Sequence, residues 1–444
     1  MFKIVKTIIK YSFIFILISC ANDRKERSRG EIDDEVANTT IDTLIKESET
    51  KALSIINFYL ENSGSMVPYT NGSSDFNLAI VNLLRNIELL NLDSINLYAV
   101  NTELYPLNQN LDEFISTYNK TGIPKVGNTS TSDLNKIFEN VLGNHSDDAI
   151  SILITDAIYS VKGTKEQILH NLDTEVFKTR NEFIKALRHK DLGTLCLKLT
   201  SNYKGPYYPA VGGSIAIDQE RPYYIWIFGD NNILKDFYTK TKVFDLRGYT
   251  DNFFNLKNVE AKIDYSVIEY GKYVIGEYRK EEKEYPIHTV FRSKPSTRPD
   301  TRGQFGLAVA IDFSNVPLPD QNLLDKNNFK ISSDEYFIYD IKKIDSNTEE
   351  RTLKSIADIE DKAGANFTHI ILIKTEAKHI QSFDIELHNK IPSWVELTGS
   401  DDDTNIKDDT FSTFGFNRLS KGITDAYNEI NKSTKILSIT LNVK

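Results

Sequence analysis

The sequence is short of positive charge. Its 53 Lys and Arg residues are outnumbered by 63 Asp and Glu residues, which gives a formal net charge of −10. The one short basic stretch, residues 24–29, is interrupted by Glu26 and is typical of a solvated linker. Nucleic acids and anionic membrane surfaces attract basic faces, so this composition argues against both as charge-driven partners. We therefore expect no nucleic-acid partner.

Hydrophobic runs long enough to cross a membrane are also missing. A spanning helix needs about 20 consecutive apolar residues, and the apolar run at residues 11–19 is too short. The 444 residues are 40% hydrophobic and 26% charged, as in soluble globular proteins. This length is enough for two or three domains.

The motifs of common enzyme classes are absent as well. The seven His residues show no His-x-x-x-His spacing. Ser63-Gly64-Ser65 is not part of a Gly-x-Ser-x-Gly elbow, and no Gly-Lys-Ser/Thr follows Gly212-Gly213 to complete a phosphate loop. We therefore predict that the protein is not an enzyme, with a metal-assisted hydrolase as the less favoured alternative.

An acidic stretch begins like a calcium-binding loop but does not continue as one. Asp401, Asp403 and Asn405 occupy its positions one, three and five. Ile406 then stands where the loop requires Gly, and Ser412 stands where it requires Glu. We predict an acidic surface loop here, because acidic runs are usually solvated.

The N-terminus has the order of a targeting signal. Three basic residues open the chain: Lys3, Lys6 and Lys10. The apolar run at residues 11–19 follows and ends in Leu-Ile-Ser-Cys at residues 17–20. This order resembles a bacterial lipoprotein signal with its lipobox, which implies cleavage before Cys20 and lipid attachment to Cys20. The alternative is an ordinary secretory signal with an incidental Cys.

The lipoprotein resemblance implies a place and a redox state for the chain. A lipid anchor would hold the protein at the membrane of the cell envelope. Ala21, where an inner-membrane retention signal would have Asp, favours the outer membrane if the cell is Gram-negative. Cys196 is then the only remaining thiol, so no disulfide can form within the chain. Because Cys196 lies in an apolar run, we expect a buried and inert thiol.

The chain divides into four predicted segments. Residues 1–20 are the signal peptide, and the polar residues 21–50 form a flexible linker. Residues 51–245 alternate strands and helices, which predicts an α/β domain with a mostly parallel, Rossmann-like sheet flanked by helices. Residues 246–444 are richer in strands and predict a β-rich, sandwich-like C-terminal domain.

The hydrophobic periodicity places individual elements. In the α/β segment, strands are expected at 54–60, 95–100, 149–154, 192–199 and 223–228, and helices at 76–90, 111–118, 133–142, 175–188 and 233–237. In the β-rich segment, strands are expected at 259–270, 305–313, 336–344, 369–373, 383–387 and 436–443, with one helix at 419–430. Tyr203, Tyr207 and Tyr208 lie beside a Gly-Pro pair, which predicts an exposed aromatic loop and a second-choice contact surface.

Hard oxygen atoms gather where the first predicted strand ends. The apolar run at residues 55–60 leads directly into Glu61-Asn62-Ser63-Gly64-Ser65. A carboxylate and two hydroxyls at alternate positions suit Mg²⁺, Mn²⁺ or Ca²⁺. Ligands of open α/β sheets bind at the carboxyl ends of the strands. Ordinary turn chemistry and helix capping by the same Ser residues is the alternative.

Three segments together resemble the von Willebrand factor type A family. Residues 61–66 resemble its Asp-x-Ser-x-Ser motif, residues 127–131 resemble the loop that supplies its metal-binding Thr, and residues 152–156 resemble its strand ending in a second acidic residue. The resemblance covers about residues 51–240. It implies a metal-ion-dependent adhesion site that holds a divalent cation, Mg²⁺ first, with Mn²⁺ or Ca²⁺ as alternatives.

The resemblance also implies roles for single residues. Ser63 and Ser65 would be hydroxyl ligands, and Thr129 the third hydroxyl with Thr131 as the fallback. Asp156 would act from the second shell or through water, and Glu61 stands where the family has Asp. In the family, a carboxylate from the partner protein fills the open coordination position.

Two residues depart from the family pattern. Glu61 is longer than Asp by about 1.5 Å, and Ala157 stands where the family has Gly. The leading functional prediction is a lipid-anchored envelope protein that binds a protein partner through a cation. The alternative is an envelope scaffold with a degenerate site.

Overall fold

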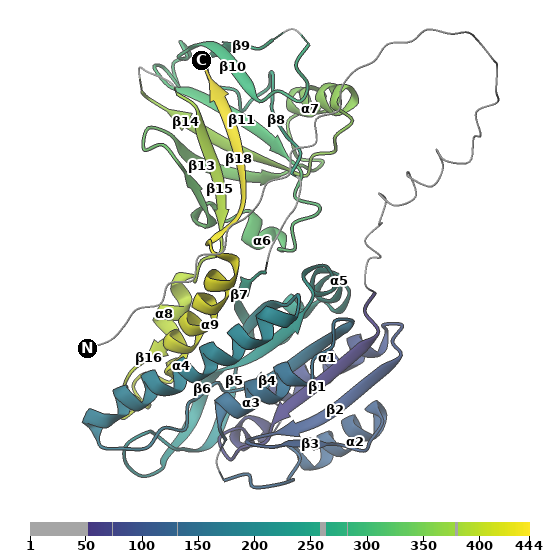
Figure 1. Ribbon diagram of the computed structural model, residues 1–444, viewed down its shortest axis with the longest axis vertical. Coiled ribbons are helices and arrows are strands. Elements are labelled where there is room, and N and C mark those ends of the chain that lie inside the picture. Colours follow the sequence, from purple (N-terminus) through teal and green to yellow (C-terminus); the bar gives the residue numbers. More distant parts are fainter. Residues whose placement is uncertain (1–51, 73, 131, 258–262, 282, 378–380) are drawn as a thin grey trace, which may run out of the picture. The chain divides into compact units, whose positions relative to one another are not determined.

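The computed structural model describes residues 52–72, 74–130, 132–257, 263–281, 283–377 and 381–444 (Figure 1). The predicted signal peptide with Cys20, the predicted linker and Thr131 lie outside the described residues. No helix within these ranges is both long and apolar enough to span a membrane.

A seven-stranded mixed sheet forms the centre of the N-terminal part. Across the sheet, the strands are β3 (Leu104–Pro106), β2 (Ser94–Val100), β1 (Ile55–Glu61), β4 (Ala149–Thr155), β6 (Ile215–Gly229), β5 (Gly193–Tyr207) and β7 (Tyr249–Asn255). β1 runs parallel to both of its neighbours, β2 and β4. The four other neighbouring pairs are antiparallel.

The prediction of a mostly parallel sheet is therefore wrong. β5 and β6 form one long hairpin, paired from Gly193–Gly229 to Tyr207–Ile215. A connection this short can only join antiparallel strands, whereas a parallel pair needs a long crossover. The sequence pattern ended the first strand at residue 199 and began the second at 223, so the hairpin that joins them was missed.

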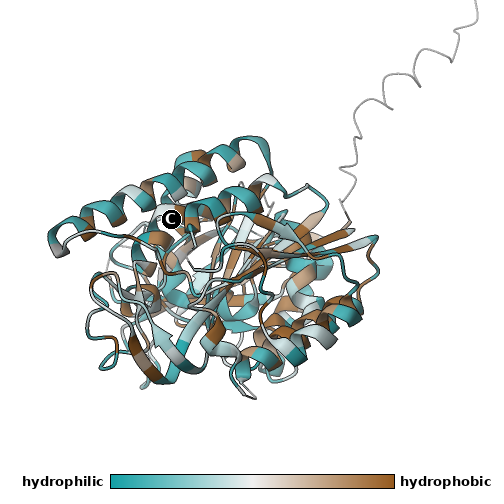
Figure 2. Cartoon of the chain, turned by 90° about the horizontal axis from the view of Figure 1, so that it is seen from below, coloured by the Kyte–Doolittle hydropathy of each residue, from teal (hydrophilic) through white to brown (hydrophobic). Residues whose placement is uncertain are grey.

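Helices cover both faces of this sheet, and all five predicted helices are present. They are α1 (Asp75–Glu88), α2 (Leu111–Thr121), α3 (Leu134–Gly143), α4 (Lys165–His189) and α5 (Asn231–Thr241), with short 3-10 turns η1 (Val67–Thr70) and η2 (Val243–Asp245). Helices α1, α2 and α5 pack on one side with Phe58 of β1, and α3 and α4 pack on the other with Tyr59. Alternate side chains of β1 thus enter two cores. Figure 2 shows hydrophobic strands within and hydrophilic outer helix faces.

The C-terminal part is β-rich, as predicted. A five-stranded sheet has the order β12 (Phe329–Ile331), β15 (Phe383–His388), β18 (Lys435–Val443), β10 (Thr289–Lys294) and β9 (Glu277–Arg279), and a four-stranded sheet has the order β13 (Phe337–Lys343), β14 (His369–Thr375), β11 (Phe305–Ile311) and β8 (Tyr265–Val267). The remaining elements are α6 (Asp320–Leu323), η3 (Lys326–Asn328), α7 (Glu350–Ala363), α8 (Ser393–Thr398), α9 (Phe416–Asn431) and the short pair β16 (Gly399–Ser400) and β17 (Thr413–Phe414). The sequence pattern missed α7.

Residues beyond 245 return to the N-terminal sheet. β7 pairs with β5 at one edge of that sheet. Helix α9 packs along α4, where a Cβ on Gly422 would come within 2.9 Å of Val176. The rings of Phe416 and Tyr224 stack with centroids 4.0 Å apart. The last helix therefore completes one face of the first sheet, and the segment before it reaches the site described next (Figure 1).

Candidate metal site

The carboxyl end of β1 presents a carboxylate and two hydroxyls in contact with one another. Glu61 and Ser63 are almost fully buried, with 1% and 3% of their surface exposed. The Ser63 hydroxyl donates to Glu61 Oε1 over 2.6 Å, and Ser63 Oγ lies 3.1 Å from Ser65 Oγ. A hydroxyl that gives its proton to a carboxylate keeps its lone pairs available for a cation.

The end of the neighbouring strand β4 adds two more side chains with oxygen atoms, Thr155 and Asp156. The Thr155 hydroxyl donates to the second oxygen of Glu61, and the Ala157 N–H donates to Thr155 Oγ1 over 2.9 Å. Asp156 Oδ1 accepts the Ile158 N–H over 3.2 Å. Asp156 Oδ2 is buried and has no hydrogen-bond partner among the described residues. Because β1 and β4 are parallel, both strand ends open at the same edge of the sheet.

The third predicted segment is held against this turn by its backbone. The Gly64 N–H donates to the Thr129 carbonyl over 2.9 Å. The Asn62 side chain donates to the carbonyls of Pro124 and Val126 over 3.0 and 2.8 Å. These contacts fix the loop, yet the hydroxyl that reaches Glu61 from it belongs to Ser132. Its hydrogen bond acts to lower the pKa of Glu61.

The structure thus brings some of the predicted ligands into contact with one another, but not all of them. Glu61, Ser63 and Ser65 form one contact group, and Asp156 interacts with both Glu61 and the Ser65 hydroxyl. Thr129 is half-buried and contributes its backbone carbonyl to the turn. Its side chain is not among the residues that line the adjoining pocket, whereas Ser130 and Ser132 are.

The electrostatics of the site favour a cation. Burial, followed by repulsion from Asp156, raises the pKa of Glu61 to about 7. Burial also raises the pKa of Asp156, against the opposing effects of the Ser65 hydroxyl and Arg221. Two carboxyl groups that share a desolvated space resist ionising together. A bound cation would remove this cost, because it compensates both negative charges.

A buried Arg supplies positive charge from the other half of the sheet. Arg221 is 1% exposed, and its guanidinium carbon lies 4.5 Å from the ring centroid of Tyr207 and 5.6 Å from that of Tyr203. It donates to the carbonyls of Thr410 and Ser412 over 3.3 and 3.4 Å. The prediction of an exposed aromatic loop is therefore wrong for Tyr203 and Tyr207, because both belong to β5 and surround this cation.

A pocket of about 350 Å³ lies beside the hydroxyls of Ser63 and Ser65. Ser63 and Ser65 form one wall and Tyr207, exposed Tyr208 and Asp403 another. Asp403 is 2% exposed and accepts the Tyr207 hydroxyl over 2.8 Å and the Ala210 N–H over 3.1 Å. The surface-loop prediction is therefore wrong for Asp403, because long-range contacts bury it.

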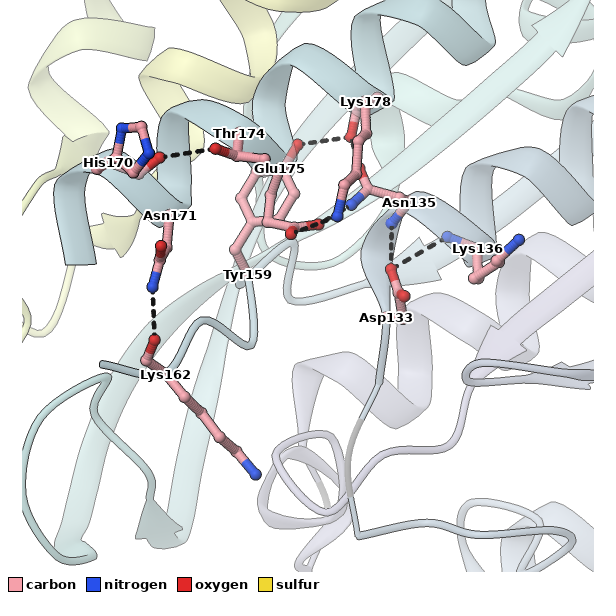
Figure 3. A network of polar contacts seen from close by, with 11 residues as sticks. Asp133, Asn135, Lys136, Tyr159, Lys162, His170, Asn171, Thr174, Glu175 and Lys178 are labelled. Carbon is pink, nitrogen blue, oxygen red and sulfur yellow. Dashed lines mark hydrogen bonds and ion pairs between the residues drawn. The ribbon is translucent and has the colours of Figure 1, made fainter. Parts of the chain in front are cut away.

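A polar network beside the pocket fixes the start of α3 (Figure 3). Asp133 caps the helix by accepting the N–H groups of Asn135 and Lys136 over 3.0 and 3.3 Å. The Asn135 side chain contacts Glu175 of α4, and the Tyr159 hydroxyl lies 2.7 Å from Thr179 Oγ1. Ser132, directly before Asp133, is thereby held on a rigid helix end.

The backbone conformation of Ala157 is costly for a residue that carries a Cβ. Ala157 has a φ of 55°, in the left-handed region that favours Gly, and its side chain is fully buried. Gly127 also has a positive φ, of 69°, and a Cβ there would collide with the Tyr105 ring at 2.2 Å. The loop before Thr129 therefore requires Gly, whereas the turn after Asp156 tolerates strain.

The residues present fit a hard cation. No cluster of three or more His, Cys, Asp or Glu side chains suited to a metal occurs in the described ranges. An ion at this site would therefore depend on hydroxyl oxygens together with Asp156, whose Oδ2 lacks a partner. Such a donor set suits Mg²⁺ and Mn²⁺ better than softer metals.

Sequence reasoning missed four residues that shape the site: Thr155, Ser132, Arg221 and Asp403. The sequence contained a signal for Thr155, because strand alternation places it at the end of β4 beside Asp156. Ser132 had a signal too, since it immediately precedes a helix cap. Arg221 and Asp403 gave none, because their roles arise from contacts between segments about 190 residues apart in the sequence.

Comparisons with known proteins add no relative. No family model matches the chain, and neither the curated proteins nor the solved structures contain a match.

Proposed function

We propose that this chain is a lipid-anchored protein of the cell envelope whose N-terminal domain resembles von Willebrand factor type A and binds a protein partner through a divalent cation. Mg²⁺ is the ion we favour, with Mn²⁺ or Ca²⁺ as alternatives. A carboxylate of the partner would complete the coordination. The β-rich part, which we take to be sandwich-like, would serve as a spacer.

One observation carries the proposal. The buried Asp156 Oδ2 lacks a hydrogen-bond partner among the described residues, and it belongs to a group that also holds Ser63 and Ser65. Leaving a buried carboxylate oxygen unpaired costs about 1–3 kcal/mol or more. A cation held by the hydroxyls offsets this cost, and the adjoining pocket gives a partner's side chain access.

A scaffold with a degenerate site is the second candidate, and a specific contact favours it. Both oxygens of Glu61 already accept hydroxyl protons, from Ser63 and from Thr155. A side chain satisfied in this way can hold the two strand ends together with no ion. The two candidates differ in a measurable property, namely the affinity for Mg²⁺.

Calorimetric titration of the purified protein with MgCl₂ after chelator treatment tests the proposal. We expect saturable binding that Ser63→Ala with Ser65→Ala abolishes. The matched control is Ser160→Ala, which removes an exposed hydroxyl from the same pocket outside the contact group. Equal Mg²⁺ affinity in the double variant and the control would exclude the cation site and leave the scaffold.

A partner experiment follows from the same design. Envelope extract is passed over immobilised protein with Mg²⁺ or with EDTA, and the retained proteins are compared. The proposal expects a protein retained with Mg²⁺, lost with EDTA and lost with the double Ser variant. Retention that ignores both changes contradicts cation-mediated binding.

A further inference from the structure

A second pocket, of about 420 Å³, lies away from the candidate metal site. Its walls come from α5, η2, α6 and the adjoining ends of β13 and β14. Most of its wall is apolar: Tyr238, Phe244, Phe313, Leu318 and Leu323. An engineered cavity of about 150 Å³ already holds benzene, so this pocket is large enough for two fused rings.

Two residues that line this pocket each carry a buried polar atom with no hydrogen-bond partner among the described residues. These atoms are Tyr238 Oη and His369 Nε2, on residues that are 5% and 2% exposed. Buried polar groups are nearly always paired, and an unpaired one costs about 1–3 kcal/mol. Two such atoms on residues that line one pocket point to a ligand that reaches and pairs with them.

The hydrogen bonds around His369 determine what its free nitrogen can bind. Thr368 Oγ1 accepts the Phe313 N–H over 2.9 Å and donates its own proton to the Ile311 carbonyl over 3.3 Å. With its proton on the Ile311 carbonyl, the Thr368 hydroxyl accepts from His369 Nδ1, which lies 2.9 Å away. This network assigns the proton to Nδ1 and leaves Nε2 as a lone-pair acceptor.

The nearest charged group does not satisfy that lone pair. Asp320 Oδ1 lies 3.6 Å from His369 Nε2, beyond hydrogen-bond distance, and both atoms are acceptors. The other Asp320 oxygen is paired with Lys343 over 2.5 Å. Lys235 is engaged as well, because its ammonium donates to the carbonyls of Ser314 and Val316.

These contacts discriminate between ligand charges. A carboxylate would face Asp320, Asp245 and the Nε2 lone pair, and it could attract only Lys242, because Lys235 and Lys343 already donate elsewhere. An ammonium would only donate, and it would lie near the ammonium groups of Lys235 and Lys343. A hydroxyl avoids both conflicts, since it can donate to Nε2 and can accept from Tyr238 Oη.

We infer that this pocket binds a small uncharged ring compound that carries hydroxyl groups, such as a phenol or a cyclic alcohol. The ring packs against Tyr238, Phe244 and Phe313, and its hydroxyls pair with Tyr238 Oη and His369 Nε2. This inference is independent of the cation site and of the proposed partner.

Three probes with one ring system test the inference: 2-naphthol, 2-naphthoate and 2-naphthylmethylamine, each titrated into the full-length protein by calorimetry. We expect saturable 2-naphthol binding below about 1 mM, within the range that ligand efficiency allows. The two charged probes should bind at least tenfold more weakly. Equal affinity for all three, or no saturable binding of 2-naphthol, would overturn the inference.

Two variants and two matched controls locate the binding. Tyr238→Phe removes only the unpaired hydroxyl, and His369→Asn keeps a donor near Nδ1 while removing Nε2. Each should weaken 2-naphthol binding about three- to tenfold, the effect of one net hydrogen bond.

The controls make the same changes at unpaired atoms elsewhere, Tyr336→Phe and His145→Asn. Both should retain the wild-type affinity. Because the replaced atoms have no protein partner, we expect Tyr238→Phe to fold normally, and circular dichroism checks this. Unchanged binding in folded Tyr238→Phe would contradict the assignment.

Discussion

The two halves of the seven-stranded sheet differ in direction and in charge. In the parallel half, β2, β1 and β4 end together and present the carboxyl groups of Glu61 and Asp156. In the antiparallel half, the hairpin of β5 and β6 supplies the buried cation Arg221 and its Tyr partners. Each half thus brings a charge that is costly to bury alone. The site therefore depends on the match between the charges of the two halves.

Removing the cation from the antiparallel half should have the largest effect. Arg221→Met leaves Asp156 without the positive charge that acts on it and weakens the packing against Tyr203 and Tyr207. We expect the free energy of unfolding to fall by about 3–5 kcal/mol, as when one member of a buried charge pair is deleted. Urea denaturation followed by circular dichroism measures this change.

The control for this variant is Arg247→Met. Arg247 forms an exposed ion pair with Asp75 at 3.2 Å, and such pairs contribute less than about 1 kcal/mol. If Arg221→Met is as mild as the control, the charges of the two halves are not coupled.

The parallel half contains a pH-sensitive group at its opposite end. His145 is buried, with Nδ1 3.0 Å from Ser151 Oγ, and burial together with Lys190 lowers its pKa to about 4. In the unfolded chain, His titrates near 6.5. As the pH falls from about 6.5 to about 4, only the unfolded state takes up this proton, so stability is lost over that window.

We expect His145 to account for a loss of about 3 kcal/mol at most between these pH values. Denaturation curves at pH 7.5 and pH 4.5 measure it, with His145→Asn as the comparison. The variant should show a smaller pH dependence. An identical slope for both proteins would mean that His145 is not the responsible group.

Neutralising Glu61 should separate its structural role from cation binding. Glu61→Gln removes the repulsion of Asp156 and weakens the acceptors of the Ser63 and Thr155 protons. We expect Mg²⁺ affinity to fall about 10- to 100-fold, the usual effect of losing a group that orients a ligand. Calorimetric titration gives the value.

Without Mg²⁺, Glu61→Gln should be no less stable than the parent, because a buried charge has been removed. A large loss of stability with unchanged Mg²⁺ affinity would instead support the scaffold.

Relaxing the turn after Asp156 should have the smallest effect. Ala157→Gly removes the strain of an Ala in the left-handed conformation, which should raise stability by about 1–2 kcal/mol. It also raises the conformational entropy of the unfolded chain, which should lower stability by about 0.4–1 kcal/mol. We expect a net gain of at most about 1.6 kcal/mol, measured by thermal unfolding.

Lys432→Gly provides the matched control, since Lys432 follows α9 with a φ of 54°. Both variants should gain similar stability, and only Ala157→Gly should change Mg²⁺ affinity. A change with Lys432→Gly would show that the effect is not local to the site.

The parallel half could be predicted from sequence, and the reason is local. The strands β1 and β4 are continuous apolar runs, and the helices between them have clear apolar faces and caps such as Asp133. The antiparallel hairpin was missed because Pro206 and Gly205 suggest a turn, although both are paired within the ladder. Helix α7 was missed because polar Thr352 and Ser355 lie on its buried face.

The candidate site likewise has a part that could be predicted from the sequence and a part that could not. Glu61, Ser63 and Ser65 lie within one turn, so their proximity follows from the sequence. Asp403 and Arg221 reach the site only through tertiary contacts with residues far away in the chain. Periodicity and motifs describe neighbours along the chain and carry no information about such pairings.

The packing of α9 on α4 also sets the order in which the molecule can be completed. Trp226 and Phe228 face the same core as Phe416 and Tyr427, so their side of the sheet stays incompletely covered until residue 431 has been synthesised. A nascent chain therefore cannot close its first domain early.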